Sequence, residues 1–301
     1  MRSEAACQTN GGRGRRARRR DPSTPIELLR GLWGVGRSEL TKLRTVRSTF
    51  LGLLATVILV VGVGALETGE RATHWPAHIS GPAGAGFDPT VTSLVGLLVG
   101  QVSIGVVGVL VMNAEYATGA IRTTFAAVPR RTRVLAAKVA VFGAVALGVG
   151  EVASFAAFLA GQSLLAGHAP HATLGQPGVL RAVVSGGLYL AVLGLFALGM
   201  GAIIRHTAGA IAAVVSLLFV LPGIVASLPV SLENVLDRYL PVNIWAVLVA
   251  VRPGRLVNFA TPGTGVPTAI LFGPWAGLAV LAGYAAVAVV VGGWLIVRRD
   301  A

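Results

Sequence analysis

The sequence predicts an all-α membrane protein with six transmembrane helices, an N-terminal interfacial amphipathic helix and both termini in the cytoplasm. The first observation is composition: the mean hydropathy is +0.76, and charged residues make up only 12% of the 301 residues. A soluble domain has roughly twice that charged share. The second observation is a set of apolar runs close to the length of about 20 residues that a helix needs to cross a bilayer. The third is an uneven distribution of Lys and Arg residues, which indicates a topology.

The apolar runs predict six spanning helices. Backbone polar groups find no water in lipid, so each run must form a helix, and the alternating pattern of a transmembrane barrel is absent. Only Arg205 and His206 separate the fourth and fifth runs, so we expect a tight turn between two antiparallel neighbours. The predicted spans are residues 49–66, 91–113, 139–166, 182–204, 207–228 and 276–297.

The distribution of basic residues predicts the orientation. With six spans, the two termini, the 113–138 segment and the 205–206 turn share one side, and this side carries 20 of the 25 Lys and Arg residues. Basic residues are enriched in cytoplasmic loops, so we expect a multi-pass protein of the cell (plasma) membrane with cytoplasmic N- and C-termini. The net charge of +13 then reflects topology and attraction to anionic membrane lipid, and we expect no nucleic-acid partner.

The chain before the first span divides into two parts. Residues 1–25 are basic and lack an apolar period, so they are predicted to be a disordered tail. In residues 26–48, Leu29, Leu32 and Trp33 recur at helical spacing, with basic residues on another face. Such a helix, leading directly into a span, is typical of the membrane interface. The alternative is a cytosolic helix packed on a partner protein. Residues 49–301 would form the six-span domain.

The outer side is predicted to hold one element besides loops. Residues 229–275 contain the apolar stretch "PVNIWAVLVAV", which stands between Pro241 and Pro253. This stretch is too short to cross a bilayer, so a re-entrant or interfacial element is expected there.

The cytoplasmic segment at residues 114–133 contains a short amphipathic pattern. Ile121, Phe125 and Val128 fall on one face of about two helical turns, and Pro129 ends the pattern. A solvated loop needs no apolar stripe, whereas a small helix that docks into a groove of a partner does. From the residues alone, an ordinary loop and a partner-docking helix both remain open.

Two cytoplasmic motifs resemble a known family. "SELTKLRTVRSTF" before the first span and "EYATGAIRTTFAAVPRRTRVLAAK" after the second are similar to the permease subunits of ABC type-2 transporters, especially those of actinobacteria. The resemblance covers about residues 30–301 and implies that the 114–133 segment is a coupling helix seated in a separate ATP-hydrolysing subunit. The residues that it places at this interface are Glu115, Tyr116, Gly119, Arg122, Thr123, Pro129 and Arg130, together with the stripe residues Ile121, Phe125 and Val128.

The sequence predicts no catalytic site. A P-loop needs a Gly-Lys-Ser/Thr motif, and neither of the chain's lysines, Lys42 and Lys138, stands in one. We therefore expect no enzyme and no cofactor bound by this chain, with ATP and Mg²⁺ held by the partner. Cys7 is the only cysteine, the outer histidines lack companion ligands, and no metal site is expected.

Four polar residues lie inside the predicted spans. Glu151 falls near the middle of the third span, where a charge is costly unless it faces the bundle interior or water. Gln101, Ser216 and Tyr284 fall at similar depth and are its candidate partners. Either these residues line a translocation path, or they make buried interhelical hydrogen bonds. Gln101 also follows "GLLVG", whose two glycines would let helices approach closely.

These inferences predict the membrane-spanning permease subunit of an ABC exporter. Two copies, or one copy and a paralogue, would pair with cytoplasmic ATPase subunits. One alternative is a secondary, proton-coupled carrier that uses Glu151 as its proton site. Another is a membrane anchor or assembly protein that transports nothing.

Overall fold

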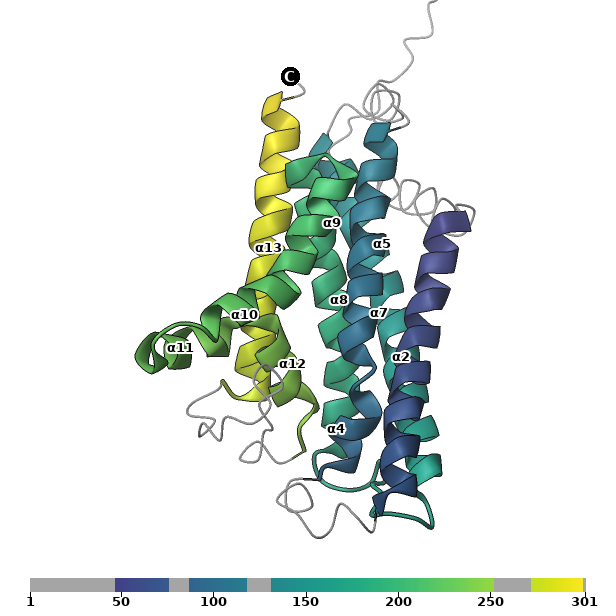
Figure 1. The fold of residues 1–301 in the computed structure, drawn as a ribbon. Coiled ribbons are helices and arrows are strands. Elements are labelled where there is room, and N and C mark those ends of the chain that lie inside the picture. Colours follow the sequence, from purple (N-terminus) through teal and green to yellow (C-terminus); the bar gives the residue numbers. More distant parts are fainter. Residues whose placement is uncertain (1–46, 76–86, 118–130, 252–271, 300–301) are drawn as a thin grey trace, which may run out of the picture.

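The computed structural model describes residues 47–75, 87–117, 131–251 and 272–299, and in these ranges the chain is helical, without a β-strand (Figure 1). Six helical stretches are long and apolar enough to cross a membrane, which confirms the predicted fold class and number of spans. They are Arg47–Thr73, Pro89–Ala114, Leu135–Leu165, Val179–Ile204, Thr207–Val225 and Pro274–Ile296. The predicted tail and nearly all of the predicted interfacial helix lie outside the described residues.

The described ranges contain twelve helical elements. In chain order they are α2 (Arg47–Thr73), α4 (Pro89–Leu94), α5 (Leu97–Ala117), α7 (Arg131–Leu165), α8 (Val179–Ile204), α9 (Thr207–Val215), the π-helical segment η2 (Ser216–Val220), α10 (Leu221–Val225), α11 (Val230–Leu236), the 3₁₀ turn η3 (Asp237–Tyr239), α12 (Pro241–Val249) and α13 (Pro274–Arg299).

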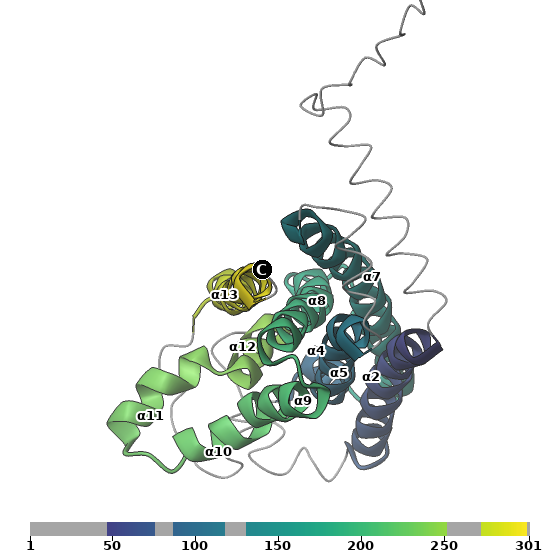
Figure 2. The ribbon, with the colours of Figure 1, turned by 90° about the horizontal axis from the view of Figure 1, so that it is seen from above.

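Helix α8 is the centre of the bundle. It packs against α5, α7 and α13, while α2 closes the far side by packing on α5 and α7 (Figures 1 and 2). Helix α9 lies along α8 and α5, but α10 and α11 run sideways, away from the bundle. Helix α12 returns to pack on α8 and α13. In its described residues, the predicted outer element thus contains α11 and α12, both too short to span a membrane.

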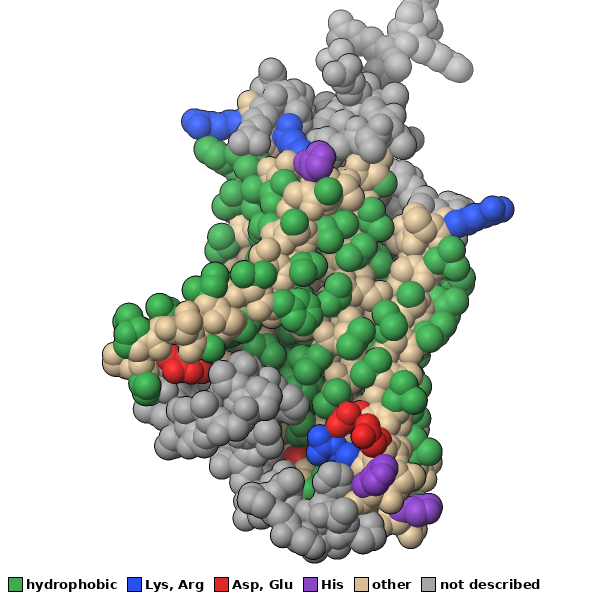
Figure 3. Space-filling view, viewed as in Figure 1, with side chains coloured by type: hydrophobic (Ala, Val, Ile, Leu, Met, Phe, Trp, Pro, Cys, Tyr) green, Lys and Arg blue, Asp and Glu red, His purple; other side chains and the backbone are tan. Residues whose placement is uncertain are grey.

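The two ends of the bundle differ in their charged side chains: Lys and Arg stand at one end, and acidic side chains lie beside a basic one at the other (Figure 3). Arg47 begins α2, Arg205 follows α8 and Arg298 lies in the last turn of α13, and these termini share one end, which we call the basic end. At the opposite, acidic end, Glu67 and Glu70 lie in the last turns of α2. Which of the two ends faces the cytoplasm stays a prediction from the distribution of basic residues.

The first span is longer than its apolar run. Helix α2 continues to Thr73 instead of ending near residue 66. Beyond the apolar run, Arg71 donates from Nε to Glu67 Oε1 at 2.8 Å, one helical turn away. An ion pair between residues four apart stabilises a helix. The helix can therefore continue beyond the apolar run that would span the membrane.

A glycine brings the first two spans into backbone contact. The second span breaks between α4 and α5, and Gly96 lies at the break against the carbonyl group of Val60 in α2. A Cβ atom at Gly96 would overlap the Val60 oxygen and lie 2.9 Å from the backbone nitrogen of Gly64. Gly100, one turn later, faces the Val60 side chain. The close approach expected from "GLLVG" is confirmed.

The predicted turn between the fourth and fifth spans is also confirmed. Arg205 takes a left-handed conformation with φ 57°, and its N–H donates to Gly201 O, which ends α8. His206 then caps α9 by accepting a hydrogen bond at Nδ1 from the Gly209 N–H, at 3.2 Å. A turn this short leaves α8 and α9 as antiparallel neighbours.

Candidate functional site

The fifth span contains a hinge-like irregularity. Between α9 and α10, the segment η2 forms π-helical hydrogen bonds, and the Leu221 N–H donates to Ser216 O five residues earlier. Pro222 explains this geometry, because its ring would clash with the carbonyl of residue Leu218 in a regular helix. Single π-helical turns often mark functional positions in helices. Ser216, predicted from the sequence as a path residue, is the first residue of this segment.

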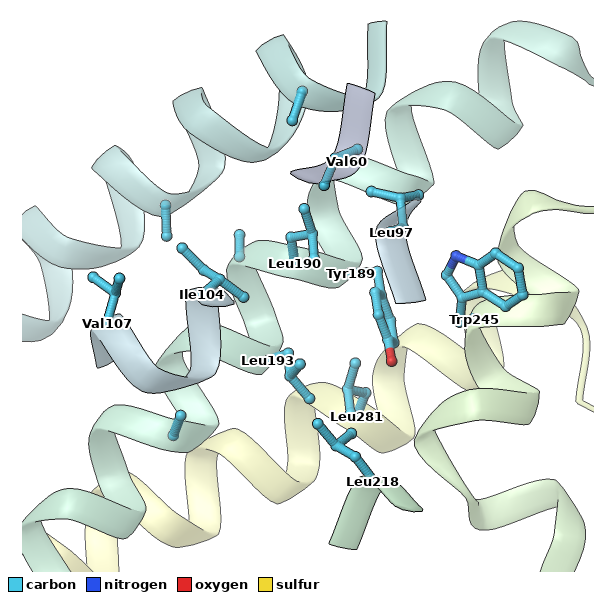
Figure 4. Close-up of a cluster of buried hydrophobic side chains, with 14 of the residues drawn as sticks. Val60, Leu97, Ile104, Val107, Tyr189, Leu190, Leu193, Leu218, Trp245 and Leu281 are labelled. Carbon is cyan, nitrogen blue, oxygen red and sulfur yellow. The ribbon is translucent and has the colours of Figure 1, made fainter. Parts of the chain in front are cut away.

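A buried polar pair lies beside the π-helical segment. The Tyr189 hydroxyl of α8 donates to Gln101 Oε1 of α5, and the two residues are 0% and 1% exposed. Figure 4 shows the Tyr189 ring among Leu97, Leu218 and Leu281, where α5, η2 and α13 converge. The pair is therefore enclosed by apolar side chains, and in this conformation Gln101 joins two helices and does not face an open path. Sequence reasoning missed Tyr189 because one tyrosine in an apolar run carries no sign of its partner.

We expect Tyr189→Phe to destabilise the fold by about 1–3 kcal/mol, because Gln101 Oε1 is buried and would lose its donor. Thermal unfolding in detergent, followed by circular dichroism, measures this loss. The double variant Tyr189→Phe with Gln101→Met replaces both polar groups by apolar ones of similar shape and should recover part of the stability. A single variant as stable as the wild-type protein would show that the hydrogen bond contributes nothing.

Glu151 lies where α7 crosses α8. A Cβ atom at Gly187 would lie 2.6 Å from Glu151 Cδ, so the carboxyl group occupies the space that this glycine leaves. One turn later, Ser154 Oγ donates to Val183 O at 2.7 Å, which joins the same two helices. Within the described part of the chain, Glu151 Oε2 is buried and has no hydrogen-bond partner. The side chain as a whole is half-buried and lies at the seam between α7 and α8.

The four polar residues predicted inside the spans do not form one cluster. Gln101 bonds to Tyr189, and Glu151 packs on Gly187. The Tyr284 hydroxyl donates to Tyr239 O at 3.2 Å, which ties α13 to the turn η3. Ser216, at the start of η2, is exposed, so the four residues lie at separate places in the bundle.

The turn η3 joins the two short outer helices. Asn243 Nδ2 donates to Asp237 O at 2.9 Å, which links the start of α12 to this turn. Burial raises the pKa of the Asp237 carboxyl, the nearby Glu233 carboxylate raises it further, and the hydrogen bond with Asn243 opposes this rise. The Tyr239 ring meets the Phe272 ring edge-on, with centroids 5.3 Å apart. The ring contact joins the turn η3 to Phe272, two residues before α13 begins.

A polar clamp, formed by Arg181, Ser185 and Asp88, holds the end of α12. Arg181 of α8 donates from Nη1 to Leu248 O at 3.2 Å and from Nη2 to Ala250 O. Ser185 Oγ also donates to Leu248 O, at 2.8 Å. From the other side, Asp88 Oδ2 accepts from the Val251 N–H at 3.2 Å, while Oδ1 caps α4. In the sequence, Arg181 was only one of the five basic residues counted on the predicted outer side. The signal that could have identified it is its place at a span end, since the last carbonyls of a helix lack partners within that helix and can accept from a basic side chain.

The predicted ATPase-coupling residues lie at the basic end or outside the described residues. Glu115 and Tyr116 belong to the last turn of α5, and α7 begins at Arg131. The segment therefore connects two spanning helices at the basic end. The remaining coupling residues, Gly119, Ile121, Arg122, Thr123, Phe125, Val128, Pro129 and Arg130, lie outside the described residues.

The sequence matches no protein-family model, and no curated protein is similar to it at a significant level.

Proposed function

We propose that this multi-pass protein is the membrane-spanning permease subunit of an ABC transporter, acting as an exporter and driven by a separate cytoplasmic ATPase. The basic end would face the cytoplasm, as the distribution of Lys and Arg residues favours. The chain would then be a passive gate, and a second copy or a paralogue would complete the transporter.

One observation carries this proposal: the segment with the family-like motif connects α5 to α7 at the basic end. Helix α5 packs on α8, α2 and α9, and α7 packs on α2 and α8. A force applied to residues 118–130 therefore acts on two helices that touch most of the bundle. A coupling element needs such a position. A partner shifts the equilibrium between two conformations only through contacts that differ between them, so it must act on helices that move.

The irregular fifth span supports a moving gate. Its π-helical segment and Pro222 interrupt regular hydrogen bonding between α9 and α10. Such interruptions are tolerated in membranes where the backbone is buried in protein or lines a cavity. We place the conformational change at this span, beside the Gln101–Tyr189 pair.

A proton-coupled carrier is the second candidate, and one observation favours it: the buried Oε2 atom of Glu151 has no partner among the described residues. The two proposals differ in the expected effect of Glu151→Gln. A carrier that protonates this carboxyl group loses transport in the variant, whereas a permease retains ATP hydrolysis by its complex because glutamine fills the same space.

Affinity purification in mild detergent tests the ABC proposal. We expect a subunit with Walker motifs to co-purify with the wild-type protein and to be lost in Phe125→Asp, because a carboxylate on the apolar stripe cannot enter an apolar groove. Ala126→Asp adds the same charge outside the stripe and should retain the partner.

Two outcomes contradict the proposal. One is purification of a stable protein with no nucleotide-hydrolysing companion. The other is transport in vesicles that contain this chain alone.

A further inference from the structure

Asn113 bridges two helix ends beside the coupling segment. It lies in the last turns of α5 and is 2% exposed. In the carboxamide orientation that satisfies both polar groups, Nδ2 donates to Gly201 O at 2.9 Å and Oδ1 accepts from the Thr207 N–H at 3.2 Å. The first bond reaches the last turn of α8, and the second reaches the first N–H of α9. One side chain of α5 thus holds both sides of the α8–α9 turn.

The same turn is connected to the last helix. Arg205, which ends α8, donates from Nη2 to Leu295 O of α13 at 3.3 Å. Its left-handed conformation fixes the direction of the chain into α9. At the basic end, the ends of α5, α8, α9 and α13 are therefore joined by hydrogen bonds through one short turn. Asn113 is the member of this set nearest in sequence to residues 118–130.

We propose that Asn113 is a positioning residue that passes displacement of the coupling segment to the α8–α9 turn. This inference rests on the proposed function. Helix α5 also packs on α9, but at the basic end Asn113 joins α5 directly to the start of the fifth span. Two hydrogen bonds from a buried carboxamide form a stiffer link than apolar contact, because they fix direction as well as distance. Helix α9 then carries the motion to the π-helical segment.

Thr207→Pro breaks this link without changing Asn113. Thr207 is the first residue of α9, a position where proline is well tolerated because its N–H has no partner within the helix. The preceding residue, His206, has φ −119° and ψ 119°, close to the conformation that proline requires before it. Proline removes the donor, and its ring displaces the Asn113 oxygen. Thr207→Ser keeps the N–H and is the matched control, and Asn113→Ala removes the link from the other side.

The experiment uses the purified complex with its ATPase in a Cys7→Ser background, with bimane attached to a single cysteine. One reporter, Ala136→Cys, lies on an exposed position of α7 beyond the coupling segment, and the other, Ala208→Cys, lies on an exposed position of α9. The probe is ATP with vanadate, which traps the closed ATPase. In the wild-type complex we expect an emission shift at both positions. In Thr207→Pro and Asn113→Ala we expect the shift at Ala136 to persist and the shift at Ala208 to be lost, while Thr207→Ser keeps both.

A shift at Ala208 that survives Thr207→Pro overturns the inference, as does a wild-type complex that responds at Ala136 alone. A general packing role for Asn113 would weaken both responses together, which also contradicts it. If no ATPase co-purifies, or if neither position responds in the wild-type complex, the proposed function itself fails. If Asn113→Ala does not fold, Thr207→Pro decides alone.

Discussion

Gly96→Ala is expected to yield little folded protein, because no side chain fits between α2 and the break in the second span. The added Cβ atom would overlap the Val60 carbonyl oxygen and lie 2.8 Å from its carbon and 2.9 Å from Gly64 N. These are backbone atoms, so no rotamer change relieves the contact, and the two helices must separate. We expect a loss of more than about 3 kcal/mol, above the usual range for overpacking. Monodisperse yield after detergent extraction and the thermal midpoint measure it.

Gly62→Ala is the matched control. Gly62 lies in α2 near Val60, but a Cβ atom there would meet nothing within 4 Å. Alanine is favoured over glycine in a helix by about 0.5–1 kcal/mol, so this variant should be at least as stable as the wild-type protein. Equal behaviour of the two variants would show that α2 does not approach Gly96 so closely.

The features predictable from the sequence are those set by local chemistry. Each span was predictable from the length of its apolar run. The tight turn at Arg205 and His206 was predictable because only these two polar residues separate two apolar runs. The close helix contact at Gly96 and Gly100 was predictable because glycine has no side chain to keep a neighbouring helix away. An irregularity of the fifth span near Pro222 was also predictable, because proline lacks the N–H that a regular helix needs.

The pairings could not be predicted, because they depend on which helix faces which. Gln101 was identified by its depth, but its partner, Tyr189, lies 88 residues away in a run whose only other polar side chain is Ser185. Arg181 and Asp88 read as charges at span ends, and only the path of α12 between them makes them partners. Asn113 looked like the end of a span. Its two hydrogen bonds require the turn at residues 205–206 to lie beside it, and this proximity depends on how the helices pack.

The two ends of the bundle are held together by different hydrogen bonds. At the basic end, Asn113 and Arg205 join the ends of α5, α8, α9 and α13 next to the proposed coupling segment. At the acidic end, Gln162 of α7 donates to Pro89 O and Ser93 Oγ of α4, and its Oε1 accepts from the Ala172 N–H. These bonds fix α4, whose capping residue Asp88 also holds Val251. The outer element is thus fastened to the part of the bundle least exposed to the coupling segment.

Arg181→Leu is expected to release the end of α12 from α8. The last carbonyls of a helix have no partner within it, and a cation there is favourable. Losing the guanidinium leaves Ala250 O without this donor and Leu248 O with Ser185 only, at a cost of about 1–3 kcal/mol. We would measure maleimide labelling of Ala250→Cys in a Cys7→Ser background, since Ala250 is only 3% exposed. Each loss of about 1.4 kcal/mol in closing free energy raises labelling about tenfold.

Two further variants separate the clamp from a general effect of charge. Arg71→Leu removes a basic residue at the same end. Arg71 is partly exposed and, among the described residues, pairs with Glu67 of its own helix, so labelling should not change. Arg181→Lys keeps the charge, yet an ammonium group cannot reproduce the planar fork that reaches two carbonyls, so an intermediate rate is expected. If Arg181→Leu labelled no faster than Arg71→Leu, Asp88 and Ser185 alone would hold α12. Arg181 would then contribute to the orientation of the chain in the membrane but not to holding α12.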